Sequence, residues 1–246
     1  MMTPLTRLTA LALADALSAC AYTAPTTAGA GRTALLMRMD VEGSFQAANP
    51  NVTYYVVFNA TATPSSDVLV GPRFNGPNVA RPREFIEGRL PFIYQLINDL
   101  PSAWTDFYFF QGTADGRGRV GRGAIREGLP VILDENYAAN QWTLANNNKS
   151  LNMTIFLDQL TGNPKPTRLD VSLGTGDSIT DGYGMIFDRW KNNVPFHLEI
   201  SPTIQRDTDI SPATVINVPN RPLTQLPPGV GLTDVNIVGW EARAAS

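Results

Sequence analysis

Cysteine and histidine are almost missing from this sequence, which holds one of each among 246 residues. A zinc or haem centre is built from several nitrogen or sulfur ligands, and Cys20 and His197 together are too few for one. A single cysteine also leaves no pair for a disulfide within the chain. We therefore expect neither thiol chemistry nor a resident transition metal.

Charge is also scarce. Charged residues make up 17% of the chain and the formal net charge is -3, whereas ordinary soluble domains have about 25% charged residues. No run of lysine or arginine occurs, so the sequence predicts no nucleic-acid partner. Glycine and proline are plentiful, with 20 and 19 residues, which favours many turns and few long helices.

The first twenty residues have the pattern of a secretory signal. Arg7 precedes a short apolar run, Leu8 to Leu17, which is too short to span a bilayer and ends in small residues. Leu17-Ser18-Ala19-Cys20 resembles the lipobox of bacterial lipoproteins. That resemblance implies cleavage before Cys20 and a diacylglycerol on its thiol. Residues 1–20 are then a signal peptide with lipobox.

An alternative remains at the same place. Ala19-Cys20-Ala21 also fits an ordinary signal-peptidase site, which would give a secreted protein without the cysteine. In the lipoprotein case, residues 21–31 are small and polar and form a flexible tether of about 18 Å root-mean-square reach. We expect a location in the bacterial cell envelope, facing outside the cytoplasm, with the bilayer as a partner through the Cys20 lipid.

From Arg32 onward, apolar and polar residues alternate with the period of two that is typical of β-strands. We expect a single domain over residues 32–246, an antiparallel β-sandwich (Ig-like or jelly-roll-like) of about eight or nine strands with long proline-rich loops. The predicted strands are residues 35–41, 54–58, 106–111, 119–125, 141–146, 151–157, 169–173, 196–200 and 235–242. The segment Asp106 to Gln111 is apolar on both faces, which predicts a central strand.

Three segments depart from this pattern. Pro82 to Leu100 is a helix candidate, although Pro91 would kink a helix there, and half a strand with half a turn of helix fits the segment equally well. Thr61 to Pro82 and Ser201 to Leu232 are predicted to be irregular. The second is rich in proline, and we expect a strap that crosses the surface before the last strand.

The loop Gly174 to Gly182 contains the sharpest catalytic motif. Its Gly-Asp-Ser-Ile-Thr resembles the first block of SGNH (GDSL-type) hydrolases, which implies Ser178 as a nucleophile. Such a serine needs a base. The only histidine is His197, and Val194 stands three residues before it where that family has aspartate. We expect a glycine-rich turn and no enzyme, and we keep the hydrolase as an alternative.

The same loop offers Asp177 and Asp181 as carboxylate ligands. Calcium binds six to eight oxygen ligands, and carboxylates supply such oxygens. A structural calcium ion is therefore the one cofactor that these residues could hold. No other cofactor is expected.

Aromatic residues give a further candidate site. Trp104, Trp142 and Trp190 with Tyr183 could stack on the apolar faces of sugar rings, or they could fill the core of the sandwich.

A broader resemblance covers more of the chain. The aromatic segment Tyr54 to Phe58, the segment Trp104 to Tyr108, the strand from Leu151 to Leu160 and the later Leu169-Asp170-Val171 look like the DOMON and family-9 carbohydrate-binding-module sandwiches. That resemblance implies an extracytoplasmic ligand-binding domain. We expect a membrane-anchored, non-catalytic binding or structural lipoprotein, with envelope or extracellular polysaccharide as a candidate partner. A third alternative is a cell-envelope assembly component that pairs through exposed strand edges.

Overall fold

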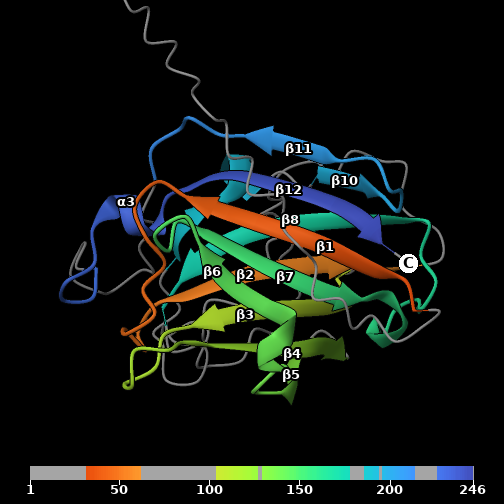
Figure 1. The fold of residues 1–246 in the computed structure, drawn as a ribbon, viewed down its shortest axis with the longest axis horizontal. Coiled ribbons are helices and arrows are strands. Elements are labelled where there is room, and N and C mark those ends of the chain that lie inside the picture. Colours follow the sequence, from red (N-terminus) through yellow and green to blue (C-terminus); the bar gives the residue numbers. More distant parts are fainter. Residues whose placement is uncertain are drawn as a thin grey trace, which may run out of the picture.

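The computed structural model describes residues 32–61, 104–126, 129–177, 186–193, 196–213 and 226–245. These residues form two antiparallel sheets that face each other (Figure 1). The first sheet has the order β11 (Gln205–Thr208), β12 (Ile237–Ala245), β1 (Ala34–Val41), β7 (Ser150–Phe156) and β6 (Trp142–Ala145). The second has the order β10 (Phe196–Glu199), β8 (Arg168–Gly176), β2 (Thr53–Asn59), β3 (Asp106–Gln111), β4 (Arg119–Arg126) and β5 (Leu129–Asp134), and β9 (Ile186–Arg189) also pairs with β8. The all-β sandwich is confirmed.

Helices in the described residues are short connections. They are η1 (Ala139–Gln141), η2 (Leu157–Gln159), η3 (Trp190–Asn193) and α3 (Leu232–Val235). The predicted helix candidate, residues 82–100, and nearly all of the predicted irregular segment 61–82 lie outside the described residues.

The number of strands is a correction. All nine predicted segments form strands, but the described residues contain twelve. The three that were missed are β5, β9 and β11. β5 is apolar without alternation and contains Pro130, and β9 has only four residues. β11 reads Gln-Arg-Asp-Thr and has no apolar face, because it is an edge strand with alternately half-buried and exposed residues. The expected strap over residues 201–232 is therefore wrong at 205–208.

The core lies between the sheets. The inward faces of both sheets contribute to one cluster of buried side chains, including Leu35, Met37 and Met39 from β1 and Tyr54 and Phe58 from β2. Alternation along each strand places these side chains on the same face, so packing two such faces removes them from water. Apolar burial of this kind is the main stabilising contribution to the fold.

β3 is buried on both faces, as its sequence predicts. It pairs with β2 on one side and with β4 on the other, and all six of its residues are buried. Tyr108 and Phe110 belong to the core between the sheets, while Phe107 and Phe109 belong to a second buried cluster on the opposite face of the same sheet. Central strands therefore contribute to two clusters at once.

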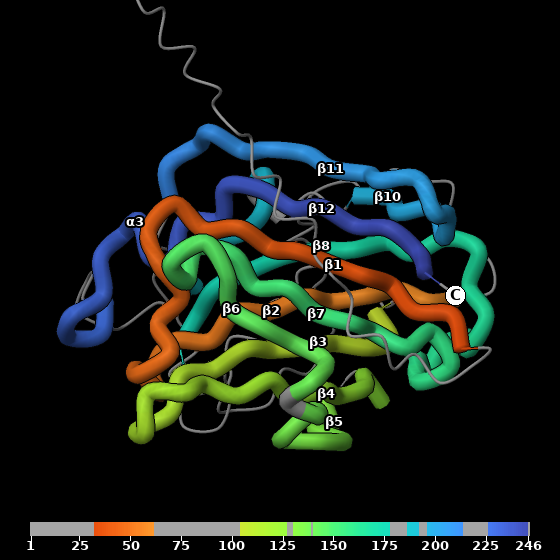
Figure 2. The backbone as a smooth tube through the Cα atoms, viewed as in Figure 1, coloured from red at the N-terminus to blue at the C-terminus, as the bar shows by residue number. Residues whose placement is uncertain are grey.

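The first and last strands are neighbours in the middle of one sheet. β1 pairs with β12 in antiparallel register, with Ala34 opposite Ala245, and β7 lies on the other side of β1. Figure 2 shows the two strands side by side, with the C-terminal end of β12 next to the start of β1. The beginning and the end of the sandwich therefore lie at the same end of the molecule, which is where the candidate site is found.

Candidate functional site

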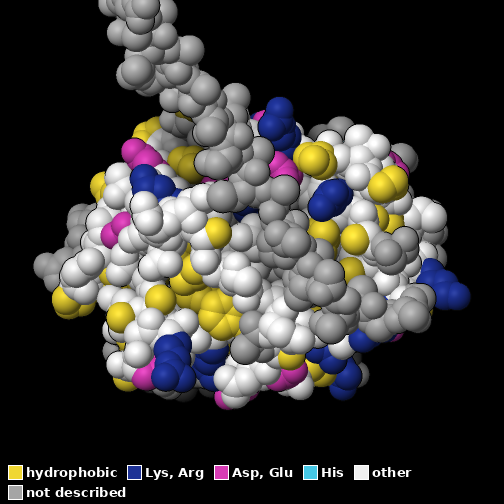
Figure 3. All heavy atoms as spheres, in the orientation of Figure 1, with side chains coloured by type: hydrophobic (Ala, Val, Ile, Leu, Met, Phe, Trp, Pro, Cys, Tyr) yellow, Lys and Arg dark blue, Asp and Glu magenta, His cyan; other side chains and the backbone are white. Residues whose placement is uncertain are grey.

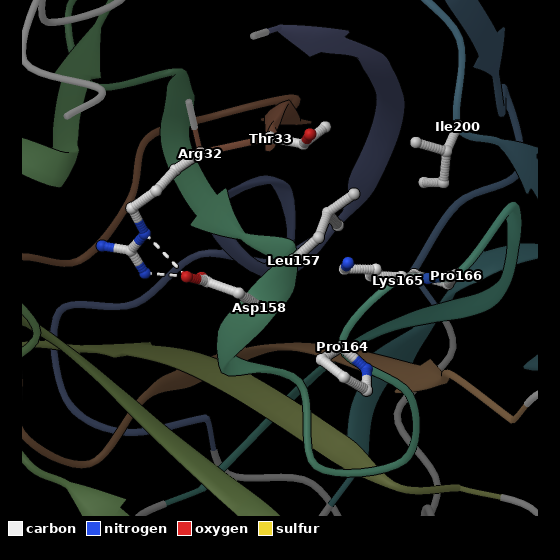
Figure 4. Close-up of a pocket in the computed structure, with 8 residues that line it drawn as sticks. All are labelled: Arg32, Thr33, Leu157, Asp158, Pro164, Lys165, Pro166 and Ile200. Atoms are coloured by element: carbon white, nitrogen blue, oxygen red, sulfur yellow. Dashed lines mark hydrogen bonds and ion pairs between the residues drawn. The ribbon is translucent and has the colours of Figure 1, made fainter. Parts of the chain in front are cut away.

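A pocket of about 460 Å³ opens at the end of the sandwich where β1 begins (Figure 4). Four segments form it: the residues that lead into β1, η2 after β7, the turn that precedes β8, and the residue that follows β10. Its lining residues are Arg32, Thr33, Leu157, Asp158, Pro164, Lys165, Pro166 and Ile200. Pro164 and Pro166 have no N–H to donate to a strand ladder, which keeps this turn out of the sheets.

One wall of the pocket is an ion pair. Arg32 donates to Asp158 from Nε at 2.8 Å and from Nη2 at 2.5 Å, and its guanidinium lies 4.0 Å from the centre of the Phe156 ring. Hydrogen bonding to Arg32 lowers the pKa of Asp158, and the same bond raises the pKa of Arg32. The two charges cancel each other, so this wall is polar without net charge.

Lys165 is the unbalanced charge of the pocket. Its backbone N–H donates to the side chain of Asn163, and its side chain is exposed. No carboxylate in the described part of the chain forms an ion pair with its ammonium group. In Figure 4 Lys165 lies on the side away from the Arg32–Asp158 pair. The described lining therefore has a net charge of about +1.

Apart from Thr33, the remaining described lining of the pocket is aliphatic. Leu157 is 3% exposed and belongs to the core cluster, and the half-buried Ile200 packs against that cluster. Figure 4 shows Leu157 and Ile200 projecting from opposite sides toward the same space, with Pro164 and Pro166 below them. The described lining thus combines an apolar floor with the Arg32–Asp158 ion pair and the ammonium group of Lys165.

The tryptophans that were predicted as a sugar platform are not among the described lining residues of the pocket. Trp190 is 1% exposed in the main core, and Trp104 is 6% exposed in the second cluster. Trp142 is half-buried, and its ring packs edge-on against Phe110 at 5.6 Å between centroids. Tyr183 lies outside the described residues. The three described tryptophans are spread over the fold and do not form a single exposed row.

The loop after β8 is only partly described. Asp177 is buried at 6% exposure, whereas Ser178 and Asp181 lie outside the described residues. Within the described ranges, no group of three or more His, Cys, Asp and Glu side chains is placed to hold a metal ion. A calcium site at Asp177 and Asp181 remains a prediction.

His197 is held by a buried carboxylate. Its Nδ1 lies 2.6 Å from Oδ1 of Asp170, whose side chain is fully buried and also accepts a hydrogen bond from Asn59 at 3.3 Å. A carboxylate that orients a histidine in this way is also found in catalytic triads. Here the pair sits near the start of β8, where His197 is opposite Asp170, and Gly176 at the far end is six residues, or about 20 Å, away.

No local pattern in the sequence marks the pocket. Arg32, Asp158, Lys165 and Ile200 come from four separate stretches, and none of them stands in a motif. Only the placement of Lys165 between Pro164 and Pro166 marks a turn.

Surface charge and membrane segments complete the description. On the face shown in Figure 3, the described acidic and basic side chains are dispersed and do not gather into a patch of one sign. No helix among the described residues has the length and apolar character required to cross a bilayer. Cys20 lies outside the described residues.

Comparison with family models, with curated proteins and with solved structures finds no match for this chain.

Proposed function

We propose that this protein is a membrane-anchored extracytoplasmic lipoprotein whose β-sandwich is a non-catalytic binding domain, with the pocket beside Arg32 as its ligand site. The observation that carries the proposal is the position of the pocket. It lies where the sandwich joins residues 21–31, the predicted tether to Cys20.

The case for the anchor rests on Leu17-Ser18-Ala19-Cys20. The only cysteine of the chain stands where a lipobox requires it, directly after a short apolar run. The described core is packed with aliphatic and aromatic side chains and uses no thiol. A tether over residues 21–31 would hold the pocket at a root-mean-square distance of about 18 Å from the lipid.

The case for binding rests on the lining. A volume of about 460 Å³ is in the range of small-ligand sites, and the apolar floor with a few polar groups is typical of them. Among the described lining residues, Thr33 has the one hydroxyl, and no histidine or cysteine accompanies it. The position of His197 at the opposite end of β8 from the Gly174–Gly182 loop also favours a non-catalytic role over a hydrolase centred on Ser178.

Intact mass spectrometry of the protein extracted from membranes tests the anchor. We expect a chain that starts at Cys20 and carries a diacylglycerol-sized increment. A Cys20→Ala variant should lose the increment and leave the membrane fraction. An unmodified chain that starts at Tyr22 would contradict the lipoprotein and would indicate a secreted sandwich.

A further inference from the structure

We infer that the pocket beside Arg32 binds a small amphipathic carboxylate, with the carboxylate on the Lys165 ammonium and the aliphatic body against Leu157 and Ile200. This inference rests on the proposed function, because it names the ligand class of the same pocket.

The charges of the pocket select an anion. Arg32 is occupied by Asp158 through two hydrogen bonds, so its charge is already compensated. Lys165 forms no ion pair within the described part of the chain, and its ammonium is a three-donor point charge without an acidic partner. A carboxylate placed here would form a charge-assisted hydrogen bond, while a cationic ligand would meet the same charge unfavourably.

The walls of the pocket select an aliphatic body. Leu157 continues into the core, and Ile200 packs against that core from the end of β10. No aromatic ring is among the described lining residues, so this part of the pocket offers no flat surface on which neutral sugars stack. Methylene groups that enter this space leave water for an apolar surface, which strengthens binding by about fourfold for each fully buried group.

The position of the pocket suggests how such a ligand arrives. A carboxylate amphipath can come from solution or from the bilayer to which Cys20 would attach the chain. With residues 21–31 as a tether, the root-mean-square distance of the pocket from that surface would be about 18 Å. The ligand chemistry is the same in both cases, and the experiment separates the two sources.

Isothermal titration calorimetry with sodium octanoate tests the inference, with acetate as the head group alone and 1-octanol as the body alone. We expect saturable binding of octanoate and at least tenfold weaker binding of acetate and octanol. Lys165→Met should weaken octanoate about tenfold or more, because a charge-assisted hydrogen bond is lost. Lys149→Met is the matched control, since Lys149 donates to the Glu42 carbonyl far along β1 from the pocket. A parallel titration with palmitate in phosphatidylcholine vesicles shows whether the bilayer also supplies the ligand.

A second variant keeps the inference distinct from the proposed function. Thr33 is exposed at the mouth, so Thr33→Trp should fill the pocket without disturbing the core and should block every ligand. One outcome would overturn the carboxylate ligand but keep the pocket as the binding site. In that outcome octanol binds as tightly as octanoate, Thr33→Trp blocks both compounds, and Lys165→Met has no effect. If neither compound binds saturably, or Thr33→Trp changes nothing, the inference is overturned, and the mass of the membrane-extracted chain still decides the anchor independently.

Discussion

At the scale of single residues, glycines of β4 pack closely against phenylalanine rings of β3. A Cβ at Gly123 would lie 2.2 Å from Cζ of Phe107 and 2.5 Å from the carbonyl oxygen of Val131. Phe107 is fully buried in the second cluster and has no room to withdraw. The glycine is therefore required by the close approach of a ring and not by an unusual backbone angle.

We predict that Gly123→Ala destabilises the protein by about 1–3 kcal/mol, the usual effect of overpacking. Urea denaturation measures the difference in the free energy of unfolding. Gly239→Ala in β12 is the control, because its added Cβ would meet neighbouring atoms only at 3.4 Å or more. Equal losses in the two variants would show that the Phe107 contact is not the cause.

The ion pair in the pocket wall gives a prediction about pH. The pKa of Asp158 is lowered in the folded protein by the hydrogen bond from Arg32. A lowered pKa means that the contribution to stability is present above the pKa of the unfolded chain and is lost as pH falls through the folded value. Both side chains are considerably exposed, 37% for Arg32 and 52% for Asp158, so solvent limits the contribution to less than about 1 kcal/mol.

We therefore expect Asp158→Asn to be slightly less stable than the wild type at pH 7, with a difference that shrinks as the pH falls below the ordinary range of an aspartate. Chemical denaturation at a series of pH values checks this, with Asp134→Asn as a control for general charge effects. A difference that grows as the solution becomes more acidic would contradict the assignment.

At the scale of elements, the hairpin between β6 and β7 has an unusual backbone. Asn146, Asn147 and Asn148 are three consecutive residues with positive φ, at 53°, 56° and 62°. Asparagine tolerates this left-handed region better than most residues, and β-branched residues tolerate it poorly. The asparagine run thus meets a requirement of the turn, and the turn fixes how β6 pairs with β7.

We predict that Asn147→Val costs about 1–2 kcal/mol, whereas Asn147→Gly changes stability by only a few tenths. Thermal unfolding followed by circular dichroism provides the comparison. Thr143→Val in β6 introduces the same side chain at an exposed strand position and should be nearly neutral. If both valine variants lose equal stability, the backbone angle is not the reason.

At the scale of the whole molecule, the first sheet is completed by pairing between strands that are far apart in sequence. β12 lies between β11 and β1, and it supplies Ile237, Trp240 and Ala242 to the core. Its loss would leave β1 without a partner on one side and detach β11 from the sheet. Contacts between residues so distant in sequence also slow folding, because loop closure must precede them.

We predict that a chain ending at Asn236 shows no cooperative unfolding transition in differential scanning calorimetry. A synthetic peptide of residues 237–245 added in excess should restore the transition by refilling the strand position between β11 and β1. A cooperative transition in the truncated chain alone would mean that the other strands form a stable unit without β12.

The fold class and most of the strands could be predicted from local patterns in the sequence. Alternation with period two is a local property, and it located nine strands, including the central strand 106–111 with apolar residues on both faces. It could not find β11, because an edge strand that buries little leaves no apolar pattern. The tertiary structure alone decided which strands pair and therefore which side chains meet. Arg32, Asp158, Lys165 and Ile200 converge on one pocket, and Asp170 meets His197, only because distant strands align in a given register. Register depends on the packing of the whole core, so no local pattern records it.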